Sequence, residues 1–291
     1  GYPFDVREKA RTSELGYSAE MWQQFAELGL LGVPFSEDFG GFNGGGPELM
    51  VVAEGFGRGL VLEPYLATVV LSGTLIHSLG SDAQKEKLIG AIVGGELRLA
   101  RAAYEPEGRY DHTHVAATAE KSGDGYSLTG NKAVVLHGDS ADQLVVIART
   151  GGNGTDRDGL SAFIVDANAD GVSRRGYETI DGLRAAEITF NNAAAELLGE
   201  EGKGVRVLMS GLDYERVVLA GIGLGIMASC LDEIMPYMVE RKQFGQPIGK
   251  FQGVSFKLAD MATEMKAAEL MILEAGWKFE PGTASHLSLI H

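Results

Sequence analysis

Cysteine is almost absent from this sequence, and basic residues are outnumbered by acidic ones. The only cysteine among 291 residues is Cys230, so one chain cannot build a disulfide or a cysteine-based metal site. This favours a reducing, cytoplasmic compartment. Cys230 lies inside an apolar segment and is expected to be a small buried side chain. The net charge of −15 argues against nucleic acid or an anionic membrane as the main partner.

Other signals of common function classes are also missing. No uninterrupted apolar stretch reaches the roughly 18–20 residues that span a bilayer, so no membrane association is expected. The N-terminus, GYPFDVREKA, resembles neither a signal nor a transit peptide, and the absence of an initiator Met is consistent with a processed or cut piece. His112 and His114 have no further ligand at metal spacing, so no metal is expected.

No nucleotide-binding glycine motif follows a predicted strand. The sequence GIGLG, at 221–225, lies within a helical run, where the glycines indicate close packing between helices. A Walker loop, an HExxH motif and an ordered Ser–His–acid set are absent as well.

Helical periodicity dominates residues 1–97. Apolar residues recur at helical spacing after Ser18, which is a plausible N-cap. The stretch PFSEDFGGFNGGGPE, 34–48, predicts a loop. Further helices are predicted at about 48–58, 64–79 and 82–93.

The pattern changes after Gly95. Short runs with β-branched residues, separated by turns such as GDG at 123–125, predict a small antiparallel β domain over 98–200. Helical periodicity then returns in 201–291, with one long helix or a pair over 204–240 and another over 252–278. The Met-rich apolar stripe of 252–278 favours a core or a helix–helix interface. The fold class is therefore α+β, with a helical, a β and a second helical domain.

The segment VERKQFGQPIGKFQGVSFKLADM, 239–261, joins two predicted helices. Basic residues and Gly often close a helix for structural reasons alone. The same corner also presents a guanidinium, an amide, aromatic edges and a helix N-terminus, a combination that suits a pyrophosphate. Together with Glu215-Arg216 and LDE at 231–233, this segment resembles the acyl-CoA dehydrogenase family.

The resemblance extends over the earlier chain. It includes ELGLLGVPFSEDFGG at 27–41, YEP at 104–106, and GDGYSLTGNKAVVLHG at 123–138. It implies an FAD-dependent enzyme that introduces an α,β double bond into an acyl-CoA. It also implies a homo- or hetero-oligomer and an electron-transferring flavoprotein as the acceptor of electrons.

Individual positions can be matched to the family's sites. The match implies flavin-pyrophosphate contacts, reached across a subunit interface, from Arg241, Gln243 and Phe244, with Phe251 and Gln252 near the adenine half. Contacts with the flavin ring are implied at four positions, namely Tyr104, Tyr110, Val134 and Leu136.

Substrate-handling positions lie at the front of the long predicted helix. Asp213 and Arg216 match residues that meet the thiol arm and adenosine of acyl-CoA. Glu215 matches the catalytic base as the isovaleryl-CoA dehydrogenase branch places it, whereas most relatives carry that base in a later helix. Abstraction of a proton α to a thioester needs a carboxylate in a dry pocket. The alternative for Glu215 is an exposed acid paired with Arg216 or Arg206, and the residues alone favour neither.

Three departures from the family leave rival functions open. The family's C-terminal domain continues beyond the point that corresponds to His291, the N-terminus begins inside the family's first helix, and EGRYD, 107–111, replaces a small, hydroxyl-rich flavin loop. The β domain resembles the small-subunit branch of pimeloyl-CoA-type dehydrogenases, and the last third resembles the isovaleryl branch. The rivals are a half-site subunit of a heteromeric enzyme and a relative of flavin monooxygenases or nitroalkane oxidases; an inactive fragment is a further possibility.

Overall fold

The computed structural model describes residues 3–109, 111–156 and 158–278. Its contacts divide this part of the chain into two compact units. The larger unit contains residues 3–43 and 62–215, and the smaller one contains residues 44–61 and 216–278. The division differs from the three segments read from the sequence, because helix α3 (Gly46–Gly59) belongs with the C-terminal helices.

The helical part of the larger unit follows the predicted pattern closely. It comprises α1 (Phe4–Arg11), α2 (Ala19–Glu27), two 3₁₀ turns (Leu30–Gly32 and Glu37–Phe39), α4 (Thr74–Leu79) and α5 (Asp82–Val93). Ser18 caps α2 as expected, since its side chain accepts a hydrogen bond from the Met21 N–H. The predicted helix over 64–79 is instead a π-helix, Leu66–Gly73, that continues into α4.

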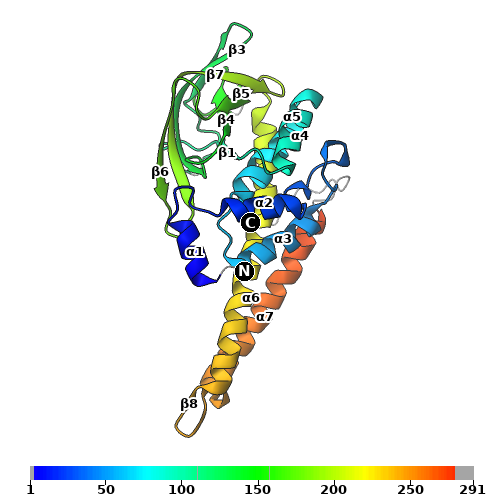
Figure 1. Ribbon diagram of the computed structural model, residues 1–291, viewed down its shortest axis with the longest axis vertical. Helices are drawn as coiled ribbons and strands as arrows, with labels where there is room; N and C mark the ends of the chain where they lie inside the picture. The colour runs from blue at the N-terminus through cyan, green and yellow to red at the C-terminus, as the bar shows by residue number, and fades with distance from the viewer. Residues whose placement is uncertain (1–2, 110, 157, 279–291) are drawn as a thin grey trace. The chain divides into compact units, whose positions relative to one another are not determined.

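A seven-stranded sheet forms the rest of this unit (Figure 1). Its strands are β1 (Leu99–Ala102), β2 (Thr118–Ser122), β3 (Gly125–Leu136), β4 (Gln143–Arg149), β5 (Leu160–Asp166), β6 (Val172–Glu178) and β7 (Arg184–Leu198). The pairings β4–β2–β3–β7–β5–β4 form a ring, while β1 adds to β4 and β6 adds to β7. Most pairings are antiparallel as predicted, but β1 and β2 each run parallel to β4.

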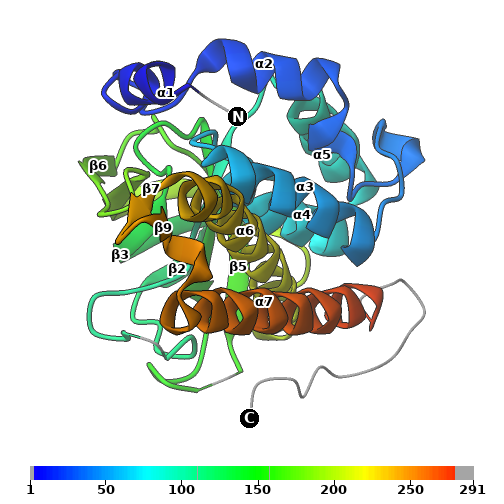
Figure 2. The same ribbon diagram turned by 90° about the horizontal axis from the view of Figure 1, so that it is seen from below.

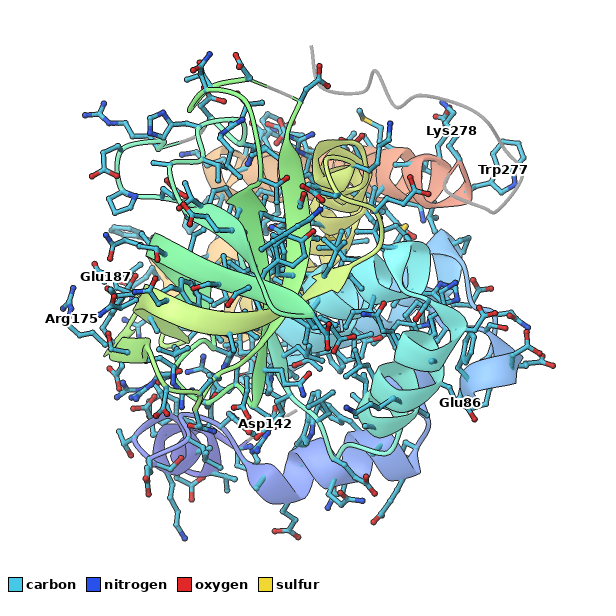
Figure 3. All side chains as sticks on the ribbon, turned by 90° about the horizontal axis from the view of Figure 1, so that it is seen from above. Glu86, Asp142, Arg175, Glu187, Trp277 and Lys278 are labelled. Carbon is cyan, nitrogen blue, oxygen red and sulfur yellow. The ribbon has the colours of Figure 1, made fainter. Side chains whose placement is uncertain are left out.

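The ring encloses an apolar core. Alternate residues of β3 and β7 and nearly all of β4 and β5 are buried. At the β6–β7 edge, polar side chains face solvent instead, and Arg175 and Glu187 point toward one another (Figure 3), with 2.8 Å between Nη2 and Oε2. The core strands therefore hold the loops at the strand ends in fixed positions.

The smaller unit is built from α3, the part of α6 (Gly204–Glu240) from Arg216 onward, and α7 (Gln252–Lys278) (Figure 2). A two-strand hairpin, β8 (Lys242–Gln243) and β9 (Gln246–Pro247), and a 3₁₀ turn (Ile248–Lys250) join α6 to α7. Gly221 and Gly225 of GIGLG pack against α3 as expected, whereas Gly223 faces open space. A Cβ on Gly225 would overlap the carbonyl oxygen of Glu54, and one on Gly57 would overlap that of Ile222.

Two sequence expectations for this unit are wrong. Cys230 is exposed rather than buried, because the apolar helix around it turns that face away from α3. The Met-rich stripe of α7 is not core: among its described residues only Gly276 is buried, and Met271 is 61% exposed. The other alternative for that stripe, a helix–helix interface, stays a prediction.

The segment Gly211–Glu240 of α6 is long and apolar enough by length and composition to cross a membrane, although Arg216 and Asp232 interrupt its apolar run. Apolar helices of protein cores pass the same test, so this is weak evidence. Within the smaller unit, Gly221 and Gly225 contact α3 closely, and Asp232 pairs with Arg58 of α3 at 2.9 Å. These contacts favour packing against protein for this part of α6.

Candidate active site

Glu215 lies in α6 and points into the larger unit. Its side chain is only 13% exposed, and Oε2 accepts a hydrogen bond of 2.7 Å from Nη2 of Arg101. Arg101 is in β1, a strand whose four residues are all buried, and its side chain is 2% exposed. The alternative of an exposed acid is therefore wrong, because the carboxylate is enclosed and pairs with a residue of the β domain.

Two aromatic rings lie next to this ion pair. The Arg101 guanidinium carbon lies 5.9 Å from the centre of the Tyr104 ring, a distance that permits a cation–π interaction. The Tyr104 ring lies 5.2 Å from the ring of His112. The structure thus brings the predicted residues Tyr104 and Glu215 to the same place, with Arg101 between them.

The loop that begins at Tyr104 is fixed by a buried ion pair. Lys132 Nζ lies 2.6 Å from Oε1 of Glu105, and both side chains are almost inaccessible to water. Glu105 also accepts the backbone N–H groups of Ala116 and Ala117, at 2.7 and 3.0 Å. Burial lowers the pKa of Lys132 to about 8, and the Glu105 carboxylate opposes that shift. Glu105 at the start of the loop is therefore bound to Lys132 of β3, and Ala116 and Ala117 at its end are bound to Glu105.

The other predicted flavin-ring positions lie at the end of β3. The register of β3 against β7 shifts between Lys132 and Val135, and Val134 has a positive φ of 51°. Its side chain is 53% exposed, whereas Leu136 is partly buried. The bulge presents an apolar side chain to the outside of the sheet. The remaining predicted position, Tyr110, lies outside the described residues.

The predicted pyrophosphate residues belong to the smaller unit and form one turn. Arg241, Gln243 and Phe244 are exposed around the β8–β9 hairpin, and Phe251 and Gln252 follow where α7 begins. Phe244 is 94% exposed with a φ of 52°, and its ring meets that of Phe251 edge-to-face at 6.3 Å. An exposed aromatic beside basic and amide donors suits a ligand with an anionic and a planar part.

Asp213 and Arg216 flank Glu215 on α6. Because consecutive residues of a helix point about 100° apart, the three side chains do not share one face. Arg216 is exposed and Asp213 is partly buried. Their roles toward a substrate stay predictions.

Arg101 is the site residue that the sequence reading missed. A signal was available, because Arg101 is a charged residue between alanines in a short apolar run, three positions before the YEP motif. A buried charge requires a partner. In the parts of the chain that the structure describes, no group of three or more His, Cys, Asp and Glu residues is arranged to hold a metal.

Three family profiles cover nearly the whole chain. The acyl-CoA dehydrogenase N-terminal domain matches residues 5–96, the middle domain matches 100–193 and the C-terminal domain matches 202–289. A mitochondrial isovaleryl-CoA dehydrogenase from Solanum tuberosum is 34% identical over 281 residues, which are 94% of this chain and 68% of that protein.

This chain belongs to the acyl-CoA dehydrogenase family. The mitochondrial isovaleryl-CoA dehydrogenase of Pongo abelii is 38% identical to it over 271 residues, or 90% of this chain. The chain spans only 64% of the length of that relative. The family membership accounts for the order of helical, β and helical parts.

Solved structures agree with this assignment. Butyryl-CoA dehydrogenase from Megasphaera elsdenii superposes with a TM-score of 0.87 and 31% identity, over 96% of this chain and 76% of that one. PigA with FAD and proline matches with a TM-score of 0.86 and 28% identity, over 93% and 74%. A chain of the ChsE4–ChsE5 complex from Mycobacterium tuberculosis matches with a TM-score of 0.82 and 26% identity, over 94% and 72%.

Proposed function

We propose that this chain is a catalytic subunit of an FAD-dependent acyl-CoA dehydrogenase, with Glu215 as the base that removes the α-proton. The observation that carries the proposal is the enclosed Glu215 carboxylate, held at 2.7 Å by a buried arginine next to Tyr104. A carboxylate shielded from water and fixed by a partner is suited to proton abstraction from a thioester, which is a weak carbon acid.

The residues present fit FAD in two respects. The exposed turn Arg241–Phe244 offers a guanidinium and an amide for the pyrophosphate and an aromatic ring that its own unit leaves 94% exposed. The bulge at Val134 offers an exposed apolar side chain against which a flat ring can pack. Val134 and Leu136 carry no hydroxyl, so polar contacts with the ring would come from backbone groups here.

Each residue then has a defined task. Arg241 and Gln243 would hold the pyrophosphate, Phe244 and Phe251 would cover the nucleotide, and Tyr104, Val134 and Leu136 would line the ring. FAD, when bound, supplies the acceptor for a hydride from the β-carbon. Glu215 takes the α-proton, while Arg101 keeps its carboxylate in one orientation. Because the matched pyrophosphate site in the family uses two chains, an oligomer is part of the proposal.

The absorption spectrum of the purified protein tests this function. The protein as purified, or after incubation with FAD, should be yellow, and anaerobic addition of a suitable acyl-CoA should bleach it. Glu215→Gln should keep the colour and lose the bleaching, because an amide cannot accept the proton. Glu233→Gln, which changes an exposed acid on the same helix, is the matched control. Normal bleaching by Glu215→Gln would show that the base lies elsewhere.

A second function is favoured by a specific observation. Val134 and Leu136 stand where the family's flavin site usually has an aromatic and a hydroxyl residue. The matched ChsE4–ChsE5 complex consists of two different chains. In this reading the chain supplies half of a heteromeric site. A colourless protein that becomes yellow and active only with a second acyl-CoA dehydrogenase subunit would support it.

We also propose an electron-transferring flavoprotein as the acceptor of the electrons and the cytoplasm as the location. The acceptor follows from the family resemblance, and the location from the single cysteine. Reduction of a purified electron-transferring flavoprotein by protein and acyl-CoA together, and by neither alone, would test the acceptor. Rapid oxygen consumption by the reduced protein would instead favour an oxidase or monooxygenase.

A further inference from the structure

Lys132 holds the backbone on both sides of Tyr104. Its Nζ donates to Oε1 of Glu105 at 2.6 Å and to the carbonyl oxygen of Ala103 at 3.4 Å. These two residues stand directly after and directly before Tyr104 in the chain. A single ammonium group therefore fixes the Tyr104 segment, residues 103–105, at both of its ends.

The same side chain belongs to the Val134 segment, residues 132–134. Ala133, which follows Lys132, donates its N–H to the carbonyl oxygen of Tyr104 at 3.0 Å. Val134 comes next, at the bulge of β3, with its positive φ of 51° and its exposed side chain. Tyr104 and Val134 thus stand on two segments that one ion pair and one backbone hydrogen bond join.

Stability alone is a poor reason for this ion pair. The lysine side chain is inaccessible to water and the glutamate side chain is 3% exposed. Removing two charges from water costs about as much as their attraction returns, so apolar residues of similar volume are often at least as stabilising. What the charges add is direction. The Glu105 carboxylate must meet Lys132 and the N–H groups of Ala116 and Ala117 at once, which restricts it to one arrangement.

We propose that Lys132 and Glu105 are positioning residues for the flavin ring, because their ion pair fixes the distance between Tyr104 and Val134. This inference rests on the proposed function, in which Tyr104 and Val134 line the ring. The two charged side chains are buried, so they act on the ring through their neighbours. A gap of about 0.5–1 Å already removes a quarter to a half of a van der Waals contact, so a small separation of the two segments weakens binding.

A double variant separates this geometric role from a role in stability. Lys132→Met combined with Glu105→Gln removes both charges, and the glutamine oxygen can still accept the N–H groups of Ala116 and Ala117. Because no buried charge is left unpaired, the free energy of unfolding of the apoprotein should stay close to that of wild type. FAD affinity, measured by flavin fluorescence titration, should fall about tenfold or more, and the visible spectrum of the bound flavin should change.

A matched double variant removes another ion pair of the same unit. Arg98 and Asp142 pair at 2.7 Å outside both segments. Arg98→Met combined with Asp142→Asn should bind FAD with the affinity and spectrum of wild type, since the asparagine oxygen can still accept the backbone N–H of residue 98. If the first double variant also kept the wild-type affinity and spectrum, the positioning role would be overturned.

Glu105→Asp covers the case in which the first double variant does not fold. It keeps both charges but shortens the reach of the carboxylate by one methylene, so the ion pair can form only if the two segments move. FAD affinity should again fall, by about tenfold. Wild-type affinity in Glu105→Asp, with the visible spectrum unchanged, would contradict the proposal.

Hydrogen exchange tests the link between the segments without FAD. The N–H of Ala133 bonds to Tyr104, so in the apoprotein it should exchange about tenfold faster in the first double variant than in wild type, while the amides of β5 exchange equally. Equal exchange at Ala133 would show that the ion pair does not hold the segments together. If wild type neither binds FAD nor is bleached by any acyl-CoA, the proposed function fails; if wild type and the first double variant bind FAD equally, only the positioning role fails.

Discussion

Lys132 and Glu105 form an ion pair of 2.6 Å in which the lysine side chain is fully inaccessible and the glutamate is 3% exposed. Glu105 directly follows Tyr104, so this pair sets the position of a residue that contacts Arg101. Because Glu105 also binds two backbone N–H groups, its carboxylate satisfies three donors at once.

Removing one partner of this pair should be strongly destabilising. Lys132→Met leaves a buried carboxylate without its cation, which costs about 3–5 kcal/mol, and urea unfolding measures the loss. Lys121→Met is the control, because Lys121 is 73% exposed and its solvent-screened pair with Glu201 should contribute little to stability. If the two variants lost the same free energy of unfolding, burial of the ion pair would not be what makes Lys132 important.

Glycine at the contact of α3 and α6 should be required for packing. Gly57→Ala or Gly225→Ala places a methyl group against a backbone carbonyl of the facing helix and should cost about 1–3 kcal/mol. Gly55→Ala, two residues before Gly57 in α3 and with open space around it, should be neutral or stabilise by about 0.5–1 kcal/mol. Thermal unfolding distinguishes Gly57→Ala and Gly225→Ala from Gly55→Ala. If Gly225→Ala stabilised the protein, the close contact between α3 and α6 would be refuted.

Acid should destabilise the protein through His137. Burial lowers the pKa of His137 from 6.5 to about 4, so between these values the unfolded chain binds a proton that the folded chain does not. Stability is therefore full above about pH 6.5 and falls as the pH drops toward about 4, by up to ~3 kcal/mol from this residue.

Urea unfolding at pH 7 and at about pH 5 measures this dependence, and His137→Asn should reduce it. Asparagine is the appropriate replacement because His137 has a positive φ of 52°, which asparagine tolerates. If the free energy of unfolding changes equally between the two pH values in wild type and in His137→Asn, other groups are responsible for the pH dependence.

Phe244 should matter for cofactor binding and little for folding. Because its side chain is 94% exposed, Phe244→Ala should change the free energy of unfolding of the apoprotein by less than about 0.5 kcal/mol. If the ring covers FAD, its loss should weaken FAD binding about tenfold or more. Flavin fluorescence titration measures the affinity, and Phe256→Ala, which removes another exposed aromatic in the same unit, should leave it unchanged.

The sequence by itself determined the order of the helical and β segments and the bounds of several helices. Ser18 caps α2, and α5, α6 and α7 begin and end where the periodicity places them, because caps, glycines and apolar spacing act over a few neighbouring residues. The close packing of GIGLG also followed from local composition. Glu215 was singled out for the same reason, as a charge beside an apolar run.

Only the tertiary structure decided which charges meet. Arg101 and Glu215 are 114 positions apart, and Lys132 and Glu105 are 27 apart, so nothing local pairs them. Cys230 and the stripe of α7 were misjudged for a related reason, since apolar neighbours in sequence do not reveal which helix face another element covers. Burial and partner choice depend on how distant segments pack, and this packing decides whether a carboxylate is a solvated charge or an enclosed base.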